Sequence, residues 1–120
     1  LTVLNICKHN QKLSLDILIK SIAEKIGIYC LVVHPVKEAY ALCNNTLYHT
    51  LGPYEPNPKL TTGAGDNFNA GFCFGQVLGL SAQLSLVLGT ATSGYYVRNA
   101  QSPNVENLVS FLKAWKKSIS

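Results

Sequence analysis

The sequence has 120 residues, the length of one compact domain, and 48% of them are hydrophobic and 13% charged. This composition excludes a disordered chain, because it supplies enough apolar side chains to bury a core. Ten Lys and Arg against six Asp and Glu give a net charge of +4, with only Lys116 and Lys117 adjacent, so no nucleic-acid-binding surface is expected. The chain starts at Leu1 and contains no Met, which we interpret as a fragment, a processed product or an incomplete record.

The first predicted helix covers residues 15–26, with Ser14 as its N-cap and Gly27 just after its last turn. Its apolar side chains share one helical face: Leu15, Leu18, Ile19, Ile22, Ala23 and Ile26. Residues 1–10 are ambiguous and fit a strand leading into a loop. Residues 28–33 form an uninterrupted apolar run, which is typical of a buried parallel strand.

A hairpin and an extended segment are predicted next. Residues 38–43 and 46–50 flank Asn44 and Asn45, two residues that favour a tight turn. The following segment is kept extended and non-helical by its prolines, Pro53, Pro56 and Pro58.

No charged residue occurs from Asn67 to Val97, a stretch long enough to span a bilayer. Glycines recur within it every four residues, a spacing found in packed transmembrane helices: Gly71, Gly75 and Gly79. Interspersed polar residues and a break between Gly79 and Ser81 instead favour two buried helices of a soluble α/β domain. A membrane or packing module remains the alternative, and we expect no membrane partner.

The helices of this second half have recognisable boundaries. The first is predicted to begin near Gly65–Asp66 and to end at Gly79, and the second to run from an N-cap at Ser81 to about Arg98. Ser102 as N-cap and Pro103 at the first position predict the start of the last helix. Its apolar face would comprise Val105, Leu108, Val109, Leu112 and Trp115. The order of all these elements indicates an α/β sandwich.

The four cysteines, Cys7, Cys30, Cys43 and Cys73, lack the close pairs that a structural zinc site needs, and no metal site is predicted. Cys30 and Cys73 lie in apolar runs, so we expect buried, reduced thiols and a cytoplasmic protein. Two disulfides of a secreted protein are the alternative. No signal peptide is predicted at the N-terminus.

The segment from Thr61 to Phe72, TTGAGDNFNAGF, is the most informative part of the sequence. We predict an extended segment, a turn of small residues and then a helix. Successive N–H groups at a helix N-terminus bind anions, and Asp66 would be the ionisable group beside the anion. Such a site suits phosphoryl transfer, with amides stabilising the phosphate and the carboxylate accepting a hydroxyl proton.

The glycine-rich segment has other possible interpretations. A tight turn in which Asp66 only caps a helix remains open. A Walker A loop is excluded because no Gly-Lys-Ser/Thr follows, and a dinucleotide-binding fingerprint because its strand and third glycine are not at the right spacing.

The longer string closely resembles the C-terminal signature of the ribokinase-like, or PfkB, carbohydrate kinases, DTTGAGD-x-F-x-A-G. The matching positions are Thr61, Thr62, Gly63, Ala64, Gly65, Asp66, Phe68, Ala70 and Gly71. The resemblance extends over about residues 28–115. It implies a ribokinase-like three-layer α/β/α sandwich, of which residues 1–120 would be the C-terminal nucleotide-binding portion.

This resemblance implies ATP-dependent phosphorylation of a hydroxyl on a sugar or related small alcohol, with Mg²⁺ as a cofactor. Asp66 would be the catalytic base. The backbone amides of Gly63, Ala64, Gly65 and Asp66 would form the anion hole for the γ-phosphate. This portion alone would be inactive, and a homodimer would form through lid strands that these residues do not include.

The resemblance also points to residues near the nucleotide. Those from Gly89 to Ser93 would lie near the adenine, or would only allow close helix packing. His34 would be a nucleotide neighbour or a solvated loop residue. Asn69 lies about one helical turn beyond Asp66 and would contact nucleotide or face solvent.

Two departures from the family pattern matter. In the family, the Asp that opens the signature helps to bind an activating monovalent cation. In this sequence Leu60 stands at that position, which puts K⁺ dependence in doubt. The sugar-binding half and the N-x-x-E motif associated with magnesium are not recognisable. The alternative is therefore a nucleotide-binding pseudokinase or regulatory module without phosphotransfer.

Overall fold

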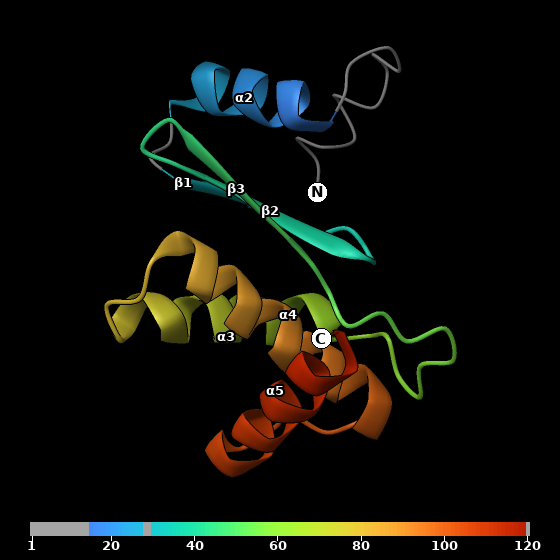
Figure 1. Ribbon diagram of the computed structural model, residues 1–120. Coiled ribbons are helices and arrows are strands. Elements are labelled where there is room, and N and C mark those ends of the chain that lie inside the picture. The colour runs from blue at the N-terminus through green and yellow to red at the C-terminus, as the bar shows by residue number, and fades with distance from the viewer. Residues whose placement is uncertain (1–14, 28–29, 120) are drawn as a thin grey trace.

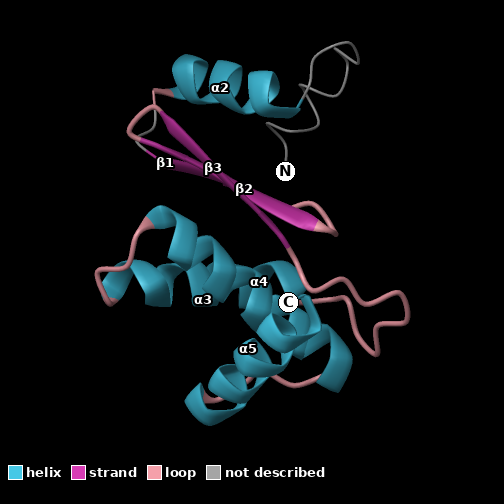
Figure 2. Cartoon of the chain, viewed as in Figure 1, coloured by secondary structure: helices cyan, strands magenta, loops and turns pink. Residues whose placement is uncertain are grey.

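The computed structural model describes residues 15–27 and 30–119. Helix α2 (Leu15–Ile26) covers one face of an antiparallel sheet of three strands, β1 (Cys30–Val33), β2 (Glu38–Cys43) and β3 (Thr46–Leu51), in that order. Helices α3 (Ala64–Val77) and α4 (Ala82–Asn99) cover the other face, and α5 (Val105–Ile119) packs against α4 (Figures 1 and 2). The helix–sheet–helix layering confirms the predicted α/β sandwich.

The sheet separates two hydrophobic clusters because successive side chains of a strand point to opposite faces. On one face Ala39 and Ala41 of β2 pack with Phe68 and Phe72 of α3 and with Leu86 of α4. The other face is occupied by a smaller cluster, Ile19 of α2 with Val33 and Leu42. The predicted core face of α2 is confirmed at its centre, although Ile26 is 47% exposed. Ser14, Cys7 and the predicted strand in residues 1–10 lie outside the described residues.

The predicted hairpin is confirmed. β2 and β3 pair with Cys43 opposite Thr46, and both connecting asparagines adopt positive φ, 50° at Asn44 and 63° at Asn45. Two positive φ values define the turn whose twist matches that of the flanking strands, and Asn tolerates them better than most residues.

The prediction of a buried parallel strand over residues 28–33 is wrong in two respects. β1 pairs antiparallel with β2, Val33 lying opposite Tyr40, and of its residues only Val33 is fully buried. The connection from Val33 to Glu38 contains too few residues for a parallel crossover, which needs about a dozen.

The cysteine prediction is also corrected. Cys30 and Cys43 lie opposite each other on β1 and β2, with Cα atoms 4.2 Å apart, and they form a disulfide instead of reduced thiols. Cys73 has a free thiol as expected, but it is exposed on α3 rather than buried. The pairing depends on how two strands meet, which the spacing of the cysteines does not reveal.

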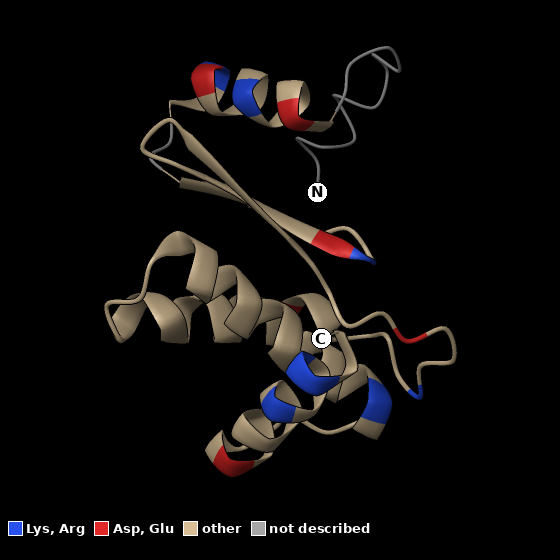
Figure 3. Cartoon of the chain, in the orientation of Figure 1, with Lys and Arg blue, Asp and Glu red and all other residues tan. Residues whose placement is uncertain are grey.

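The long uncharged segment forms α3 and α4, the pair that is almost entirely free of charged residues in Figure 3. α3 ends at Val77, two residues before the predicted Gly79, and Ser81 caps α4 as predicted by accepting the Leu84 N–H at 3.2 Å. In the described part of the chain, none of the helices has both the length and the apolar character needed to cross a bilayer.

The predicted start of the last helix is wrong. α5 begins at Val105, where Asn104 and Asn107 cap it reciprocally: each side-chain oxygen accepts the other's backbone N–H, at 2.7 and 3.0 Å. Of the predicted apolar face, Leu108 is buried, while Val105 and Val109 are 63% and 44% exposed.

Candidate functional site: the N-terminus of α3

The glycine-rich segment forms a turn that leads directly into α3. The Ala64 N–H donates to the Thr61 carbonyl at 3.1 Å, which closes the turn before the helix begins. Gly63, the N-cap, has φ of +94°, a left-handed conformation that favours glycine. The turn and the helix start therefore lie where the sequence predicted them.

Backbone N–H groups are available at this end of α3. Among the described residues, the amides of Gly63, Gly65 and Asp66 have no hydrogen-bond acceptor, whereas that of Ala64 is used in the turn. The positive end of the helix dipole adds to their attraction for an anion. The Asp66 side chain lies in this first turn and is exposed, as a group that must meet a substrate would be.

A cavity of about 290 Å³ opens beside this helix start. It lies between the loop after β1, the proline-containing segment after β3, and α4. Two of the predicted nucleotide neighbours, His34 and Ser93, line it together with Ala64 and Gly65 of the turn. The structure thus brings residues from three distant parts of the sequence to one site.

The other two predicted neighbours lie elsewhere. Gly89 faces the ring of Phe68, whose Cε2 would be 2.7 Å from an added Cβ, so its role here is close packing between helices. Asn69 is exposed on α3 and does not line the cavity.

His34 forms part of both the cavity wall and the core. Its ring stacks on that of Phe68, with centroids 4.1 Å apart and planes inclined by 15°. Burial lowers the pKa of His34 from its usual value of 6.5, because the imidazolium would lose its hydration. The imidazole is therefore neutral at pH 7. In this form it can stack on an aromatic ring or take part in a hydrogen bond.

This pKa shift predicts a pH-dependent contribution to stability. The unfolded chain binds a proton at His34 more tightly than the folded chain does. The contribution of the buried, neutral His34 to the free energy of unfolding is therefore complete above pH 6.5 and declines as the pH falls below that value. The free energy of unfolding of the intact protein, measured in urea at pH 7.5 and pH 5.5, should fall more for wild type than for His34→Phe, which retains a stacking ring. Equal pH dependence in the two proteins would contradict it.

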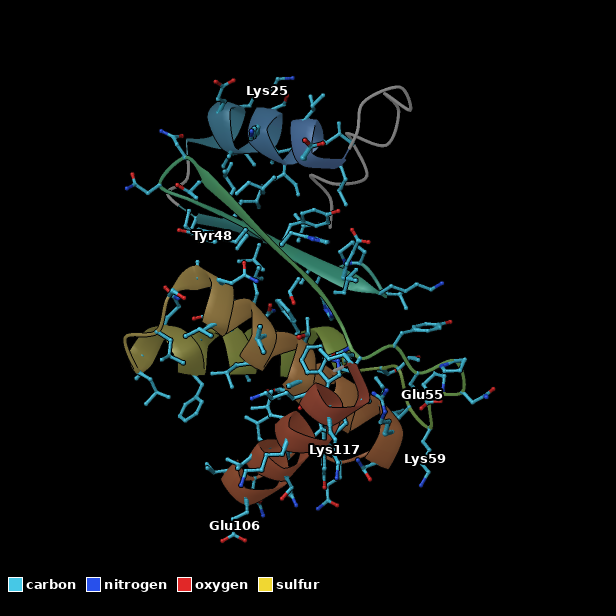
Figure 4. The ribbon with its side chains drawn as sticks, viewed as in Figure 1. Lys25, Tyr48, Glu55, Lys59, Glu106 and Lys117 are labelled. Atoms are coloured by element: carbon cyan, nitrogen blue, oxygen red, sulfur yellow. A yellow bond between two sulfur atoms is a disulfide. The ribbon has the colours of Figure 1, made fainter. Side chains whose placement is uncertain are left out.

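The segment after β3 forms one wall of the cavity, and Arg98 holds this segment in place. Its guanidinium donates to the carbonyls of Gly94 and Tyr54, at 2.9 and 3.2 Å, and its Nε lies 3.6 Å from a carboxylate oxygen of Glu55. The Lys59 N–H donates to the carbonyl of Val97 at 2.7 Å. Glu55 and Lys59 project from this segment beside α4 (Figure 4).

Sequence reasoning missed one residue that contacts the turn, Tyr96. The Tyr96 hydroxyl donates to the Thr62 carbonyl at 2.6 Å, a contact between residues 34 positions apart in the chain. Tyr96 does not belong to the glycine-rich motif, and only the packing of α4 against the turn brings it there.

Comparisons with known proteins agree with this architecture. A family model for prokaryotic ketohexokinase matches residues 3–115. The ketohexokinase of Haloferax volcanii is 34% identical over 93 residues, which are 77% of this chain and 24% of that protein. The chain therefore spans about a quarter of the curated relative that it matches.

Solved structures are similar in fold. The ribokinase from Thermotoga maritima has a TM-score of 0.72 and 24% identity, over 84% of this chain and 35% of that one. A pyrophosphate-dependent kinase of the ribokinase family, complexed with a pyrophosphate analog and myo-inositol, has a TM-score of 0.65 and 17% identity, over 81% and 35% of the two chains. The chain belongs to the prokaryotic ketohexokinase family, and with it to the ribokinase-like (PfkB) carbohydrate kinases.

Proposed function

We propose that the intact protein containing this chain transfers the γ-phosphoryl group of ATP to a hydroxyl of a ketohexose, and that the chain supplies its C-terminal nucleotide-binding portion. The observation that carries this proposal is the N-terminus of α3. There, unpartnered amides and an exposed carboxylate lie next to a cavity of about 290 Å³. The ketohexose as acceptor rests on the ketohexokinase relatives alone.

Each part of the site has a role in this reaction. The Asp66 carboxylate accepts the proton of the attacking hydroxyl. The amides of Gly63, Gly65 and Asp66 donate hydrogen bonds to the oxygens of the transferring phosphoryl group, where negative charge is concentrated. Because these donors are fixed at a helix N-terminus, little reorganisation accompanies the reaction.

The cavity supports a nucleotide as the phosphoryl donor. Its lining includes apolar side chains, among them Val36 and Val97, and the small residues Ser93 and Gly94 of α4. The flat adenine base could be placed between the loop that carries Val36 and the residues of α4, whereas pyrophosphate would leave the cavity unfilled. Asn69 and Gly89 are not part of the proposed nucleotide site, because they do not line this cavity.

The cations that accompany the reaction would depend little on this chain. Among residues 15–27 and 30–119, no three potential metal-ligating side chains cluster together. Mg²⁺ is typically held by substrate phosphates, waters and one or two carboxylates, which fits its arrival with the nucleotide. Leu60 offers no carboxylate to a monovalent cation, so we propose that K⁺ is not required.

Initial rates measured with a matrix of donors and acceptors test this function. ATP and pyrophosphate would each be combined with fructose, ribose and myo-inositol. The proposal predicts the highest kcat/KM for ATP with fructose, and little change when NaCl replaces KCl. A higher kcat/KM with pyrophosphate, or with either of the other acceptors, would contradict the corresponding assignment.

A second candidate is a nucleotide-binding module without phosphotransfer, favoured by Leu60 at the position where the family signature has Asp. It predicts that ATP binds, as measured by calorimetry, and that no sugar is phosphorylated.

A cytoplasmic location and a homodimer formed through lid strands remain predictions.

A further inference from the structure

We propose that Tyr96 of α4 is a positioning residue for the anion hole, acting through the Thr62–Gly63 peptide. The inference rests on the proposed function, since it assigns a role in orienting one of the donors to the phosphoryl group. Tyr96 lies outside the glycine-rich motif, and its side chain is only partly buried.

Tyr96 holds the peptide unit that joins Thr62 and Gly63. The Thr62 carbonyl and the Gly63 N–H belong to the same planar trans peptide and point in opposite directions. The Tyr96 hydroxyl donates to the Thr62 oxygen at 2.6 Å. By fixing the direction of this carbonyl, Tyr96 also fixes the direction of the Gly63 N–H.

Tyr96 also packs against Gly63. A Cβ atom added to Gly63 would lie 2.8 Å from the Tyr96 hydroxyl oxygen and 3.2 Å from the ring carbon that carries it. The ring therefore lies directly against the backbone of Gly63. Glycine adopts positive and negative φ about equally readily, so the residue type alone leaves the backbone free to depart from its φ of +94°. The contact limits this freedom from the side of α4.

The next peptide, between Gly63 and Ala64, is held independently of Tyr96. The Gly63 carbonyl accepts two hydrogen bonds at 3.0 Å, from the backbone N–H and the side-chain amide of Asn67. Asn67 belongs to α3 itself, so it fixes Gly63 relative to the helix. Tyr96 fixes the preceding peptide relative to α4, which also carries the cavity residues Ser93 and Val97.

These contacts orient the Gly63 N–H before the reaction begins. Donors oriented in advance contribute most where charge develops in the transition state and little to ground-state binding. Loss of the Tyr96 hydroxyl should therefore lower kcat and leave the KM for the sugar nearly unchanged.

Kinetics of Tyr96→Phe in the intact protein test this inference, with Tyr95→Phe as the matched control. Tyr95 precedes Tyr96 on α4, and its ring packs edge-on against Phe111 with centroids 6.1 Å apart. We expect kcat to fall about 3- to 10-fold in Tyr96→Phe, the effect of one hydrogen bond, with the sugar KM within about twofold of wild type. Tyr95→Phe should retain the wild-type kcat.

A binding measurement separates positioning from a general loss of structure. Tyr96→Phe should bind ADP with aluminium fluoride and sugar, a mimic of the transferring phosphoryl group, about 3- to 10-fold more weakly than wild type, and should bind ADP alone equally well. Unchanged kcat in Tyr96→Phe, equal losses in both variants, or equally weakened binding of ADP alone would overturn the inference. A wild-type protein that phosphorylates no acceptor would instead overturn the proposed function.

Discussion

Asp66→Asn in the intact protein is expected to lower kcat by about two to four orders of magnitude, the range for loss of a general base. The amide side chain has nearly the same shape as the carboxylate but does not accept the proton of the attacking hydroxyl. The backbone amides remain in place, so binding of ATP, measured by calorimetry, should be retained. Because the Asp66 side chain is exposed, the free energy of unfolding should change by no more than about 0.5 kcal/mol.

Glu106→Gln is the matched control for this substitution. Glu106 is likewise an exposed carboxylate in the first turn of a helix, but that helix is α5 and not α3. The same chemical change there should leave kcat as it is in wild type. An Asp66→Asn protein with the wild-type kcat would show that Asp66 is not the catalytic base.

Gly71→Ala is expected to destabilise the protein by about 1–3 kcal/mol or more, the cost of overpacking a core. α3 and α4 approach closely at this glycine: an added Cβ would lie 2.4 Å from the Thr92 hydroxyl oxygen and 2.6 Å from the Leu88 carbonyl oxygen. The Leu88 carbonyl belongs to the α4 backbone and accepts the Thr92 hydroxyl at 2.7 Å, so neither group moves without cost. The two helices would have to separate.

Gly65→Ala provides the contrast within the same helix. Apart from its chain neighbours and the backbone of α3 itself, no atom of the described residues lies within 4 Å of a Cβ added at Gly65, and Ala in a helix is favoured over Gly by about 0.5–1 kcal/mol. Urea unfolding of the intact protein should therefore give opposite signs for the two variants. A Gly71→Ala protein as stable as wild type would contradict the close packing of α3 on α4.

Features set by neighbouring residues could be predicted from the sequence. The asparagine turn of the β2–β3 hairpin, the Ser81 cap of α4 and the glycine-rich start of α3 all depend on a few consecutive residues. The candidate catalytic residue could be proposed for the same reason, because Asp66 and the amides beside it belong to one continuous motif. The boundaries of α3 and α4 accordingly lie within two residues of the predicted ones.

Features set by distant contacts could not be predicted. The antiparallel direction of β1 depends on which strand lies beside β1, and so does the pairing of Cys30 with Cys43. The start of α5 could not be predicted because Ser102 and Pro103 also form a valid start signal, whereas the cap is the Asn104–Asn107 pair. Tyr96 reaches the turn from another helix, so no local pattern could have indicated it.

The structure of the intact protein with ADP, aluminium fluoride and fructose would show whether phosphoryl transfer takes place at the N-terminus of α3. The adenine base is expected to lie in the cavity between His34 and Ser93. The fluoride complex is expected to accept hydrogen bonds from the amides of Gly63, Gly65 and Asp66. The acceptor hydroxyl should lie within hydrogen-bonding distance of the Asp66 carboxylate. A nucleotide bound away from the N-terminus of α3, or a sugar hydroxyl far from Asp66, would contradict it.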